Sequence, residues 1–263
     1  MRRICFSLLC LLLTTVSAIA QHEHINVAIL GDSNTSIGGD SCNKPQGWTT
    51  YFKEVFAPAS CISYARSGAT WTNTTSTKYN TKEITGLLSD DNVIYNQVNR
   101  LEEEFKRGRQ VLPQLIIIAA GTNDAWFGKA RPQRFSKTVQ EVFRAPYPIS
   151  GMNVSAVTSL AQSVRYNCER LMQLFPEAQI VLLTPMQSIH IAPATLKQTA
   201  DIIEAAGHRM GLSVIRQDEE SCVYSLREKV RTTFTRDGTH TIPAGARRNG
   251  ISLAHRIASI LEY

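Results

Sequence analysis

Short apolar runs alternate along the chain with longer segments in which apolar residues recur every three or four positions. The short runs have the length of strands and are almost continuously apolar, which is typical of buried strands in a parallel sheet. The predicted strands are residues 25–30, 61–64, 115–120, 180–184 and 212–215.

The segments between the strands carry apolar stripes with the period of an amphipathic helix. These stripes are Ile94, Val98, Leu101 and Phe105, then Val157, Leu160, Val164, Cys168 and Leu171, and finally Leu253, Ile257 and Ile260. Strands that alternate with helices predict an α/β fold in which helices cover both faces of a parallel sheet. The stripes are interpreted as packing faces, and Cys168 as part of the core.

Two connections, residues 66–91 and 125–153, are too long for ordinary turns. Both follow the carboxyl end of a predicted strand, which is the edge where ligands bind in open α/β sheets. The first contains Trp71 and the second contains Trp126, and an indole face can stack on a sugar ring. We therefore expect Trp71 and Trp126 to contact substrate.

The N-terminal segment has the pattern of a secretory signal peptide. Arg2 and Arg3 precede an apolar run over residues 4–16, which is followed by Ala18-Ile19-Ala20. No later segment has the roughly 20 apolar residues that a membrane span needs, so stable membrane insertion is not expected. These features predict a signal peptide at residues 1–20, one domain over residues 21–263, and a periplasmic or secreted protein.

The formal net charge is +6, and acidic residues are interspersed among the basic ones. No basic stripe is visible, so nucleic-acid binding is not expected. Four cysteines follow the predicted signal peptide, and an exported location permits disulfides among them in three connectivities. They are Cys42, Cys61, Cys168 and Cys222.

Two motifs supply a candidate nucleophile and base. Ser33 lies in Gly31-Asp32-Ser33, where the first predicted strand ends and the chain turns toward a helix. Near the C-terminus, Asp237 precedes His240 by three residues, a spacing at which the carboxylate can orient the imidazole. Taken singly, each motif is also typical of helix caps and turns.

Two further motifs supply candidate hydrogen-bond donors for an oxyanion. Asn123 follows the strand predicted at residues 115–120, and its side-chain amide can donate. Gly68 follows the strand predicted at residues 61–64, where the missing side chain lets a backbone N–H approach a ligand closely.

With these four motifs together, the chain resembles the SGNH (GDSL) hydrolase superfamily. Residues 31–33 resemble its nucleophile block, Gly68 its glycine block, residues 121–124 its Asn block and residues 237–240 its Asp-x-x-His block. The resemblance implies a three-layer α/β/α sandwich with a flavodoxin-like parallel sheet and a site at the carboxyl ends of the strands.

The resemblance also implies a serine esterase without metal or organic cofactor. Ser33 would be the nucleophile, with His240 as its base and Asp237 orienting His240. The oxyanion would be bound by Ser33 N–H, Gly68 N–H and the Asn123 side chain. Asp32 and Asp124 are interpreted as hydrogen-bonding residues beside the site. His190, His208 and His255 lack an acid at the spacing of Asp237 and receive no role, and His255 is expected at the surface.

The polar, Thr/Asn-rich connections favour an ester of a carbohydrate, so the expected substrate is an acetylated polysaccharide such as xylan or pectin. A lipolytic esterase or thioesterase that acts on acyl chains is the alternative within enzymes. A carbohydrate-binding protein without catalysis and a flavodoxin-like cofactor binder are alternatives of other classes. The intact Ser/His/Asp set disfavours the first of these, and the lack of a Gly-rich phosphate loop disfavours the second. The sequence does not indicate the oligomeric state.

Overall fold

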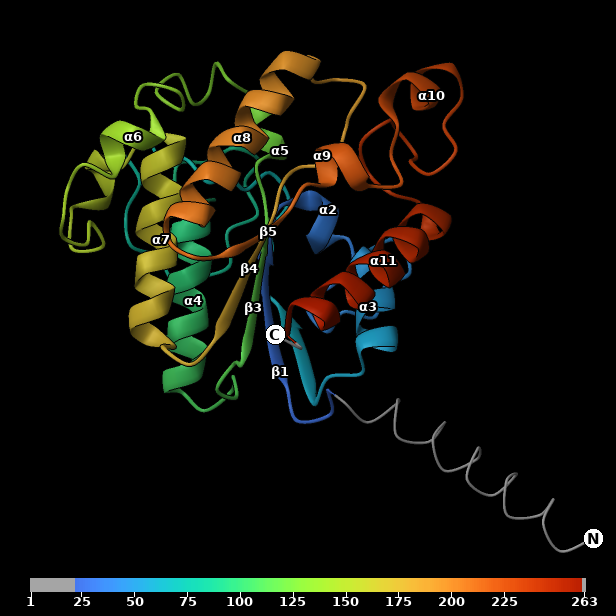
Figure 1. Ribbon diagram of the computed structural model, residues 1–263, viewed down its shortest axis with the longest axis horizontal. Helices are drawn as coiled ribbons and strands as arrows, with labels where there is room; N and C mark the ends of the chain where they lie inside the picture. The colour runs from blue at the N-terminus through green and yellow to red at the C-terminus, as the bar shows by residue number, and fades with distance from the viewer. Residues whose placement is uncertain (1–21, 262–263) are drawn as a thin grey trace, which may run out of the picture.

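The computed structural model describes residues 22–261, which form three layers with a sheet in the middle (Figure 1). The predicted signal peptide lies outside the described residues. The strands are β1 (Asn26–Gly31), β2 (Ser60–Ser63), β3 (Leu115–Ala119), β4 (Gln179–Leu183) and β5 (Ser213–Ile215). The helices are α2 (Ser33–Ser36), α3 (Trp48–Phe56), α4 (Ile94–Lys106), α5 (Thr122–Trp126), α6 (Val139–Val142), α7 (Leu160–Leu174), α8 (Pro193–Arg209), α9 (Gln217–Glu220), α10 (Ser225–Val230) and α11 (Pro243–Leu261).

The five strands are parallel and have the order β2-β1-β3-β4-β5. This is the order of flavodoxin-like folds, and it reverses direction between β1 and β3, where such folds bind ligands. The α/β fold and the parallel sheet predicted from the sequence are therefore confirmed. Each predicted strand lies within one residue of the observed bounds at either end.

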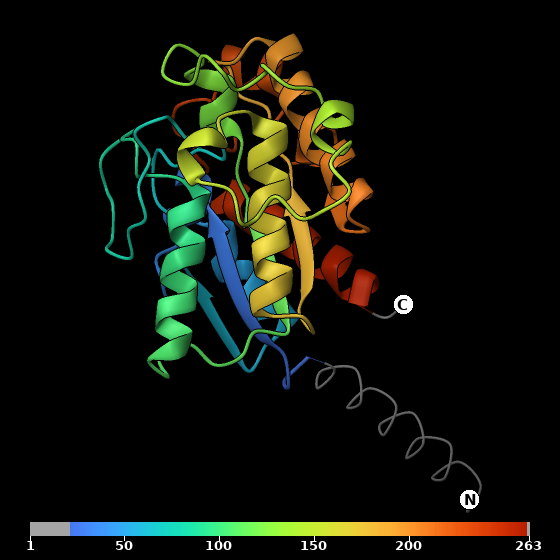
Figure 2. The same cartoon turned by 90° about the vertical axis from the view of Figure 1, so that its left-hand side faces the viewer.

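The two faces of the sheet have separate cores because side chains alternate along each strand. On β1, Ala28 and Leu30 pack toward one core while Val27 and Ile29 pack toward the other. Helices α4, α7 and α8 cover the first face, and Figure 2 shows α4 and α7 crossing in front of the sheet. Helices α3 and α11 cover the second face. The predicted stripes at Val98, Val164 and Ile257 are confirmed as packing faces, and Cys168 is confirmed as core.

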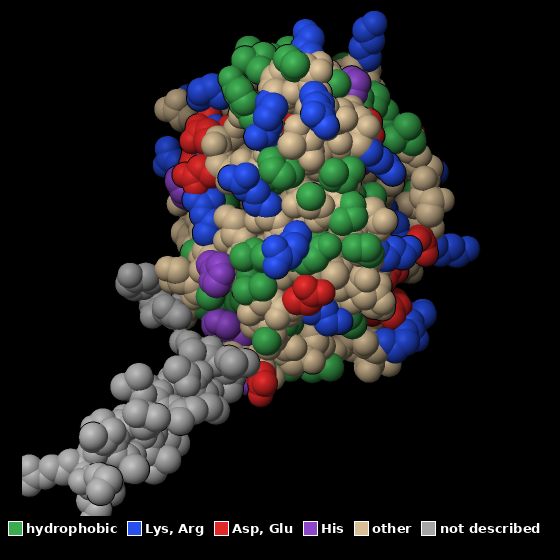
Figure 3. All heavy atoms as spheres, turned by 90° about the vertical axis from the view of Figure 1, so that its right-hand side faces the viewer, with side chains coloured by type: hydrophobic (Ala, Val, Ile, Leu, Met, Phe, Trp, Pro, Cys, Tyr) green, Lys and Arg blue, Asp and Glu red, His purple; other side chains and the backbone are tan. Residues whose placement is uncertain are grey.

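The face over α3 and α11 shows basic side chains scattered among hydrophobic and neutral ones (Figure 3). His255, on α11, is exposed as expected. Within residues 22–261, no helix is long and apolar enough to cross a membrane.

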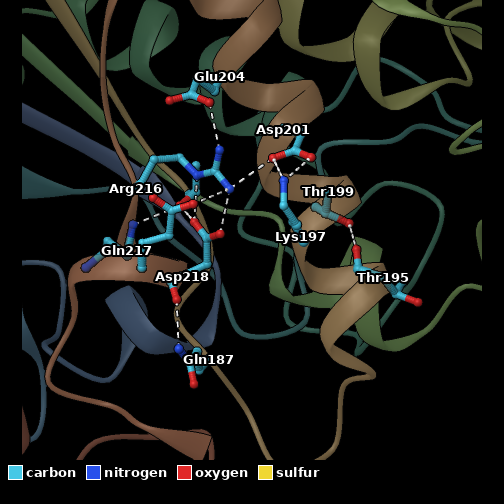
Figure 4. Close-up of polar contacts among 11 residues, drawn as sticks. Gln187, Thr195, Lys197, Thr199, Asp201, Glu204, Arg216, Gln217 and Asp218 are labelled. Carbon is cyan, nitrogen blue, oxygen red and sulfur yellow. Dashed lines mark hydrogen bonds and ion pairs between the residues drawn. The ribbon is translucent and has the colours of Figure 1, made fainter.

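An ion-pair network holds the end of the sheet near β5 (Figure 4). The Arg216 guanidinium lies 2.7 Å from Glu204 on α8 and 2.7 Å from Asp218 on α9. Asp218 in turn accepts a hydrogen bond from Thr184, which follows β4. The guanidinium thereby joins two strand ends to the helices that cover them.

The two long connections differ from one another. Residues 66–91 contain no helix or strand, as predicted. The other, residues 125–153, includes the end of α5 and the short helix α6, so the prediction of one long loop was wrong there. Thr138 is the N-cap of α6. Its side chain accepts from Glu141 N–H, and the Glu141 side chain accepts from Thr138 N–H, which is a capping box that the Thr-x-x-Glu pattern could have indicated.

Candidate active site

Ser33 is the first residue of α2, and backbone contacts of Gly31 fix its place after β1. A Cβ atom on Gly31 would lie 2.4 Å from the Ala119 carbonyl oxygen, so only glycine fits. The Gln97 side chain on α4 accepts from Gly31 N–H at 2.8 Å and donates to the Gly31 carbonyl at 2.8 Å. The Gln97 side chain therefore satisfies both backbone polar groups of Gly31 and fixes the turn that precedes Ser33.

Asp237 and His240 lie in the turn before α11. The backbone N–H of His240 donates to Asp237 Oδ1 at 2.8 Å, and His240 Nδ1 lies 2.7 Å from Asp237 Oδ2. Burial by itself raises the pKa of Asp237, but the hydrogen bonds from the His240 backbone and imidazole outweigh it and lower this pKa to about 2. Because the carboxylate only accepts hydrogen bonds, Nδ1 of His240 carries the proton and Nε2 is left as an acceptor.

The two segments meet at Ser33 and His240, which are 207 positions apart in the chain. Ser33 Oγ lies 2.9 Å from His240 Nε2, so the serine hydroxyl can donate to the imidazole. With Asp237 this forms one continuous hydrogen-bonded chain. Such an arrangement can transfer a proton from a serine to a histidine and stabilise the resulting imidazolium.

The predicted oxyanion donors lie on three segments that hydrogen bonds join. Arg66 N–H donates to the Gly31 carbonyl at 3.1 Å, and Asn123 Nδ2 donates to the Ala69 carbonyl at 2.8 Å. Gly68 therefore lies on a loop fastened at one end to the Ser33 turn and at the other to α5.

Two of these donors are free. Across the part of the chain that the structure describes, the backbone N–H groups of Ser33 and Gly68 have no acceptor. Gly68 has φ +80°, a conformation that favours glycine, and a Cβ there would lie 3.0 Å from the backbone Cα of Leu87. The Asn123 amide keeps one hydrogen beyond the one it gives to Ala69.

Asp124 fastens the loop that follows Gly68. Its carboxylate accepts from the backbone N–H groups of Trp71 and Thr72 and from the Thr72 hydroxyl, at 2.9, 2.9 and 2.6 Å. The side chain is fully buried. Asp124 thus joins α5 to the loop that follows Gly68 through three hydrogen bonds.

Asp32 is also buried, but it has fewer partners. Its Oδ1 accepts from Asn34 N–H at 3.1 Å and caps α2, whereas Oδ2 is buried without a hydrogen-bond partner. Burial raises the pKa of Asp32 to about 6, against smaller opposing effects from the polar groups of Thr122, from Asn34 N–H and from nearby His240.

The two tryptophans differ. Trp71 is fully buried in the core under α4 and α7, so the expectation that it contacts substrate is wrong. The backbone N–H of Trp71 donates to the buried Asp124 carboxylate, which keeps the residue inside the protein. Composition does not reveal this contact between distant segments. Trp126 is partly exposed and stacks in parallel on Phe127 and on His190.

His190, to which the sequence pattern gave no role, contacts the Asp237 turn. Its Nε2 lies 2.9 Å from the Asp237 carbonyl oxygen, and its ring stacks on Trp126 with 4.7 Å between ring centroids. It therefore links the Asp237 turn to α5. No spacing rule signals this contact, because 47 positions separate His190 from Asp237.

Two pockets border these segments. One, of about 680 Å³, is lined by Trp126, Phe127, His190 and further mainly apolar residues, with Lys129 and Arg134 at its wall. The other, of about 520 Å³, is polar and includes Ser36 of α2 and Ser67, the neighbour of Gly68. Neither pocket is lined by Ser33, Gly68 or Asn123 themselves, but each is lined by residues close to them in the chain, Ser36 and Ser67 in one and Ala125 in the other.

A family model, the GDSL-like lipase/acylhydrolase family, matches residues 29–248. The chain belongs to this family. Membership confirms the resemblance that the four motifs indicated, and it implies an enzyme that hydrolyses esters. No sequence among the curated proteins matches the chain.

Solved structures share the fold of this GDSL-like protein at low sequence identity. One is a possible lipase from Chitinophaga pinensis, with 16% identity, a TM-score of 0.59, and 90% of this chain and 99% of that chain covered. Another is the acetyl xylan esterase AlAXEase, with 17% identity, a TM-score of 0.53, and 90% and 99% covered. A third is a lipase/acylhydrolase from Enterococcus faecalis, with 16% identity, a TM-score of 0.51, and 90% and 97% covered.

The buried carboxyl group of Asp32 should make the stability of this GDSL-like protein depend on pH. Its pKa rises from the ordinary 3.8 to about 6 on folding, so the folded state holds the proton more tightly. Ionisation then costs stability as pH rises through this window, by about 3 kcal/mol in total. Asp32→Asn should remove this pH-dependent loss.

We expect the free energy of unfolding of Asp32→Asn to increase relative to that of the wild type as pH rises from 4 to 7. Urea denaturation at several pH values measures it. Any packing cost of the new amide is the same at every pH and cancels. A difference that stays constant over this range would contradict the assignment.

Proposed function

We propose that this protein is a serine esterase in which Ser33 is the nucleophile, His240 the base and Asp237 the residue that orients His240. The observation that carries the proposal is the chain of hydrogen bonds from Ser33 Oγ to His240 Nε2 and from His240 Nδ1 to Asp237 Oδ2, at 2.9 and 2.7 Å. A serine next to a neutral imidazole whose tautomer is fixed is what nucleophilic attack requires.

The proposed reaction has two steps. His240 Nε2 takes the proton of Ser33 as Oγ attacks the ester carbonyl carbon, and the alcohol leaves with that proton. Water then attacks the acyl-Ser33 ester with the same imidazole as base, which releases the acid. The free N–H groups of Ser33 and Gly68 and the remaining Asn123 amide hydrogen would stabilise the oxyanion in both steps.

The substrate that we propose is an O-acetyl ester of a carbohydrate. The polar pocket lined by Ser36 and Ser67 suits a hydroxyl-rich alcohol, and Trp126 in the other pocket offers an aromatic surface. An acetyl xylan esterase is among the proteins of similar fold, in keeping with this choice.

A second candidate is an esterase or thioesterase for longer acyl chains. It is favoured by the apolar wall of the larger pocket, where Leu88, Phe127 and Ile191 lie together with Trp126. An acyl chain rather than a sugar would fill that space if this candidate is correct.

We also propose that the protein is exported and that residues 1–20 are its signal peptide, on the sequence pattern alone. Expression of the full chain in a bacterial host followed by N-terminal mass analysis tests this. The mature protein should begin at Gln21 and be found outside the cytoplasm. An uncleaved chain in the cytoplasmic fraction would contradict the proposal.

Ser33 and His240 should act as one unit. Ser33→Ala and His240→Ala should each lower kcat for an aryl acetate by several orders of magnitude, and the double variant should be hardly worse than either single one. Steady-state kinetics measures all three. A double variant whose loss of kcat equals the product of the two single losses would indicate another nucleophile. A wild-type protein that binds a carbohydrate but turns over no ester would favour the non-catalytic alternative.

Asn123 should bind the transition state better than the substrate. Asn123→Ala should lower kcat by roughly 10²- to 10³-fold, with KM little changed, because the oxyanion loses a donor. The Ala69 carbonyl also loses its partner, which should cost about 1 kcal/mol of stability. Near-normal kcat in a folded Asn123→Ala variant would remove the residue from the site.

Acyl length and polymer affinity separate the two candidate substrates. For an acetylesterase, kcat/KM should fall from p-nitrophenyl acetate to octanoate to palmitate, and acetate should be released from acetylated xylan or pectin. Trp126→Ala should raise KM for the polymer more than KM for the aryl acetate. Tyr147→Ala, at an exposed aromatic outside both pockets, is the matched control. A preference for octanoate or palmitate would instead support the acyl-chain candidate.

A further inference from the structure

Two cysteine thiols lie against each other in the core beneath α3. The Sγ atoms of Cys42 and Cys61 are 3.5 Å apart, and the residues are only 1% and 4% exposed. Cys61 belongs to β2, while Cys42 lies in the loop that leads from α2 to α3. Neither thiol has a part in the proposed ester hydrolysis.

The backbone brings this loop to β2. Ser63 N–H donates to the Asp40 carbonyl at 2.8 Å, and Cys42 N–H donates to the Gly39 carbonyl at 3.1 Å. Cys42 has φ 52°, a left-handed conformation that turns the loop back toward the sheet. The closeness of the thiols therefore follows from two tied backbone segments rather than from two mobile side chains.

We propose that Cys42 and Cys61 are a disulfide-forming pair, joined when the chain folds in contact with an oxidising disulfide such as oxidised glutathione. Disulfide sulfurs are about 2.05 Å apart, and a small rotation of two thiols already in contact achieves this separation. The proposal is independent of the esterase activity.

The other two cysteines have different surroundings. Cys168 is buried in the core on the opposite face of the sheet, under α4, α7 and α8. Cys222 packs with Met186 and Val223 and donates its S–H to the Gly245 carbonyl at 3.3 Å. Burial raises the pKa of the Cys168 and Cys222 thiols, and the hydrogen bond to Cys42 together with burial raises that of Cys61, so the pair is distinguished by the 3.5 Å contact between its sulfurs and not by thiol acidity. The structure therefore favours none of the three full pairings of four cysteines, but a single Cys42–Cys61 bridge with Cys168 and Cys222 left as thiols.

The chemistry is thiol–disulfide exchange in two steps. Both residues are almost fully buried in the folded chain, so the exchange takes place during folding, and it begins when Cys42 loses its proton to water. The thiolate attacks one sulfur of oxidised glutathione and expels one glutathione thiolate. Cys61, after losing its proton, attacks Cys42 Sγ and expels the second. Two protein thiols are oxidised and one glutathione disulfide is reduced to two thiols.

The bridge would connect the two segments that carry the free N–H groups. One runs from Ser33 through α2 to Cys42, and the other from Cys61 through β2 to Gly68. Between them there is already an ion pair, in which Arg66 Nη1 lies 2.7 Å from Asp40 Oδ1. Because Asp40 is largely exposed, that pair alone is a weak link, and a covalent bond in the core below it would be much stronger.

Peptide mapping of the full chain tests the connectivity. The protein is refolded in a glutathione redox buffer, denatured without reductant and alkylated with iodoacetamide. We expect a linked peptide pair containing Cys42 and Cys61, two hydrogens lighter than the separate peptides, and alkylated Cys168 and Cys222. Alkylation of Cys42 and Cys61, or a bridge to either of the other two cysteines, would overturn the proposal.

Thermal unfolding with and without dithiothreitol is the second measurement. Closing a loop of this length should raise Tm by roughly 6–12 °C, so the reductant should lower the Tm of the oxidised protein by that amount. The Cys42→Ser/Cys61→Ser double variant should not respond to the reductant, and the Cys222→Ser control should respond like the wild type. A wild-type Tm that is insensitive to reductant, or a double variant that remains sensitive, would contradict the proposal.

Discussion

The close approach of β1 and β3 at their carboxyl ends is the constraint on which the rest of the site depends. Gly31 pairs with Ala119 in the sheet, and any side chain at Gly31 would collide with the Ala119 carbonyl. Asp32 N–H donates to this same carbonyl at 3.2 Å. The chain leaves the sheet here and enters α2, whose first residue, Ser33, contacts His240.

The other parts of the site are attached to this junction by hydrogen bonds rather than by a rigid helix or strand. Gly31 receives the Gln97 side chain and Arg66 N–H, so the loop of Gly68 is tied to the same point as Ser33. Buried Asp124 then holds the continuation of that loop at α5. Loops that would otherwise be mobile are thereby fixed, which is the arrangement that preorganised donors require.

The strands and the four motifs could be predicted because they depend on local patterns and one general rule. Buried parallel strands are continuously apolar, and their carboxyl ends share one edge of the sheet, so Ser33 and Asn123 could be placed at that edge once their strands were recognised, although their adjacency depends on the strand order. The pairing of Asp237 with His240 also follows from a spacing of three residues.

The errors and omissions concern contacts between distant segments. The polar connection that contains Trp71 suggested an accessible side chain. A hydrogen bond from Trp71 N–H to Asp124, 53 positions away, instead holds this residue in the core. His190 approaches Asp237 through a turn that no apolar period reveals, and Gln97 acts from the inner face of a helix whose pattern indicates only packing. Composition cannot report such contacts, because each depends on where a second segment lies in three dimensions.

The central claim is that Ser33 is a nucleophile activated by His240, and covalent labelling tests it most directly. The protein is treated with an alkyl fluorophosphonate, which reacts with activated serines, and the modified peptide is identified by mass spectrometry. We expect one adduct, on Ser33, that is lost in a folded His240→Ala variant. An unmodified Ser33 in active wild-type protein, or an adduct on another residue, would contradict it.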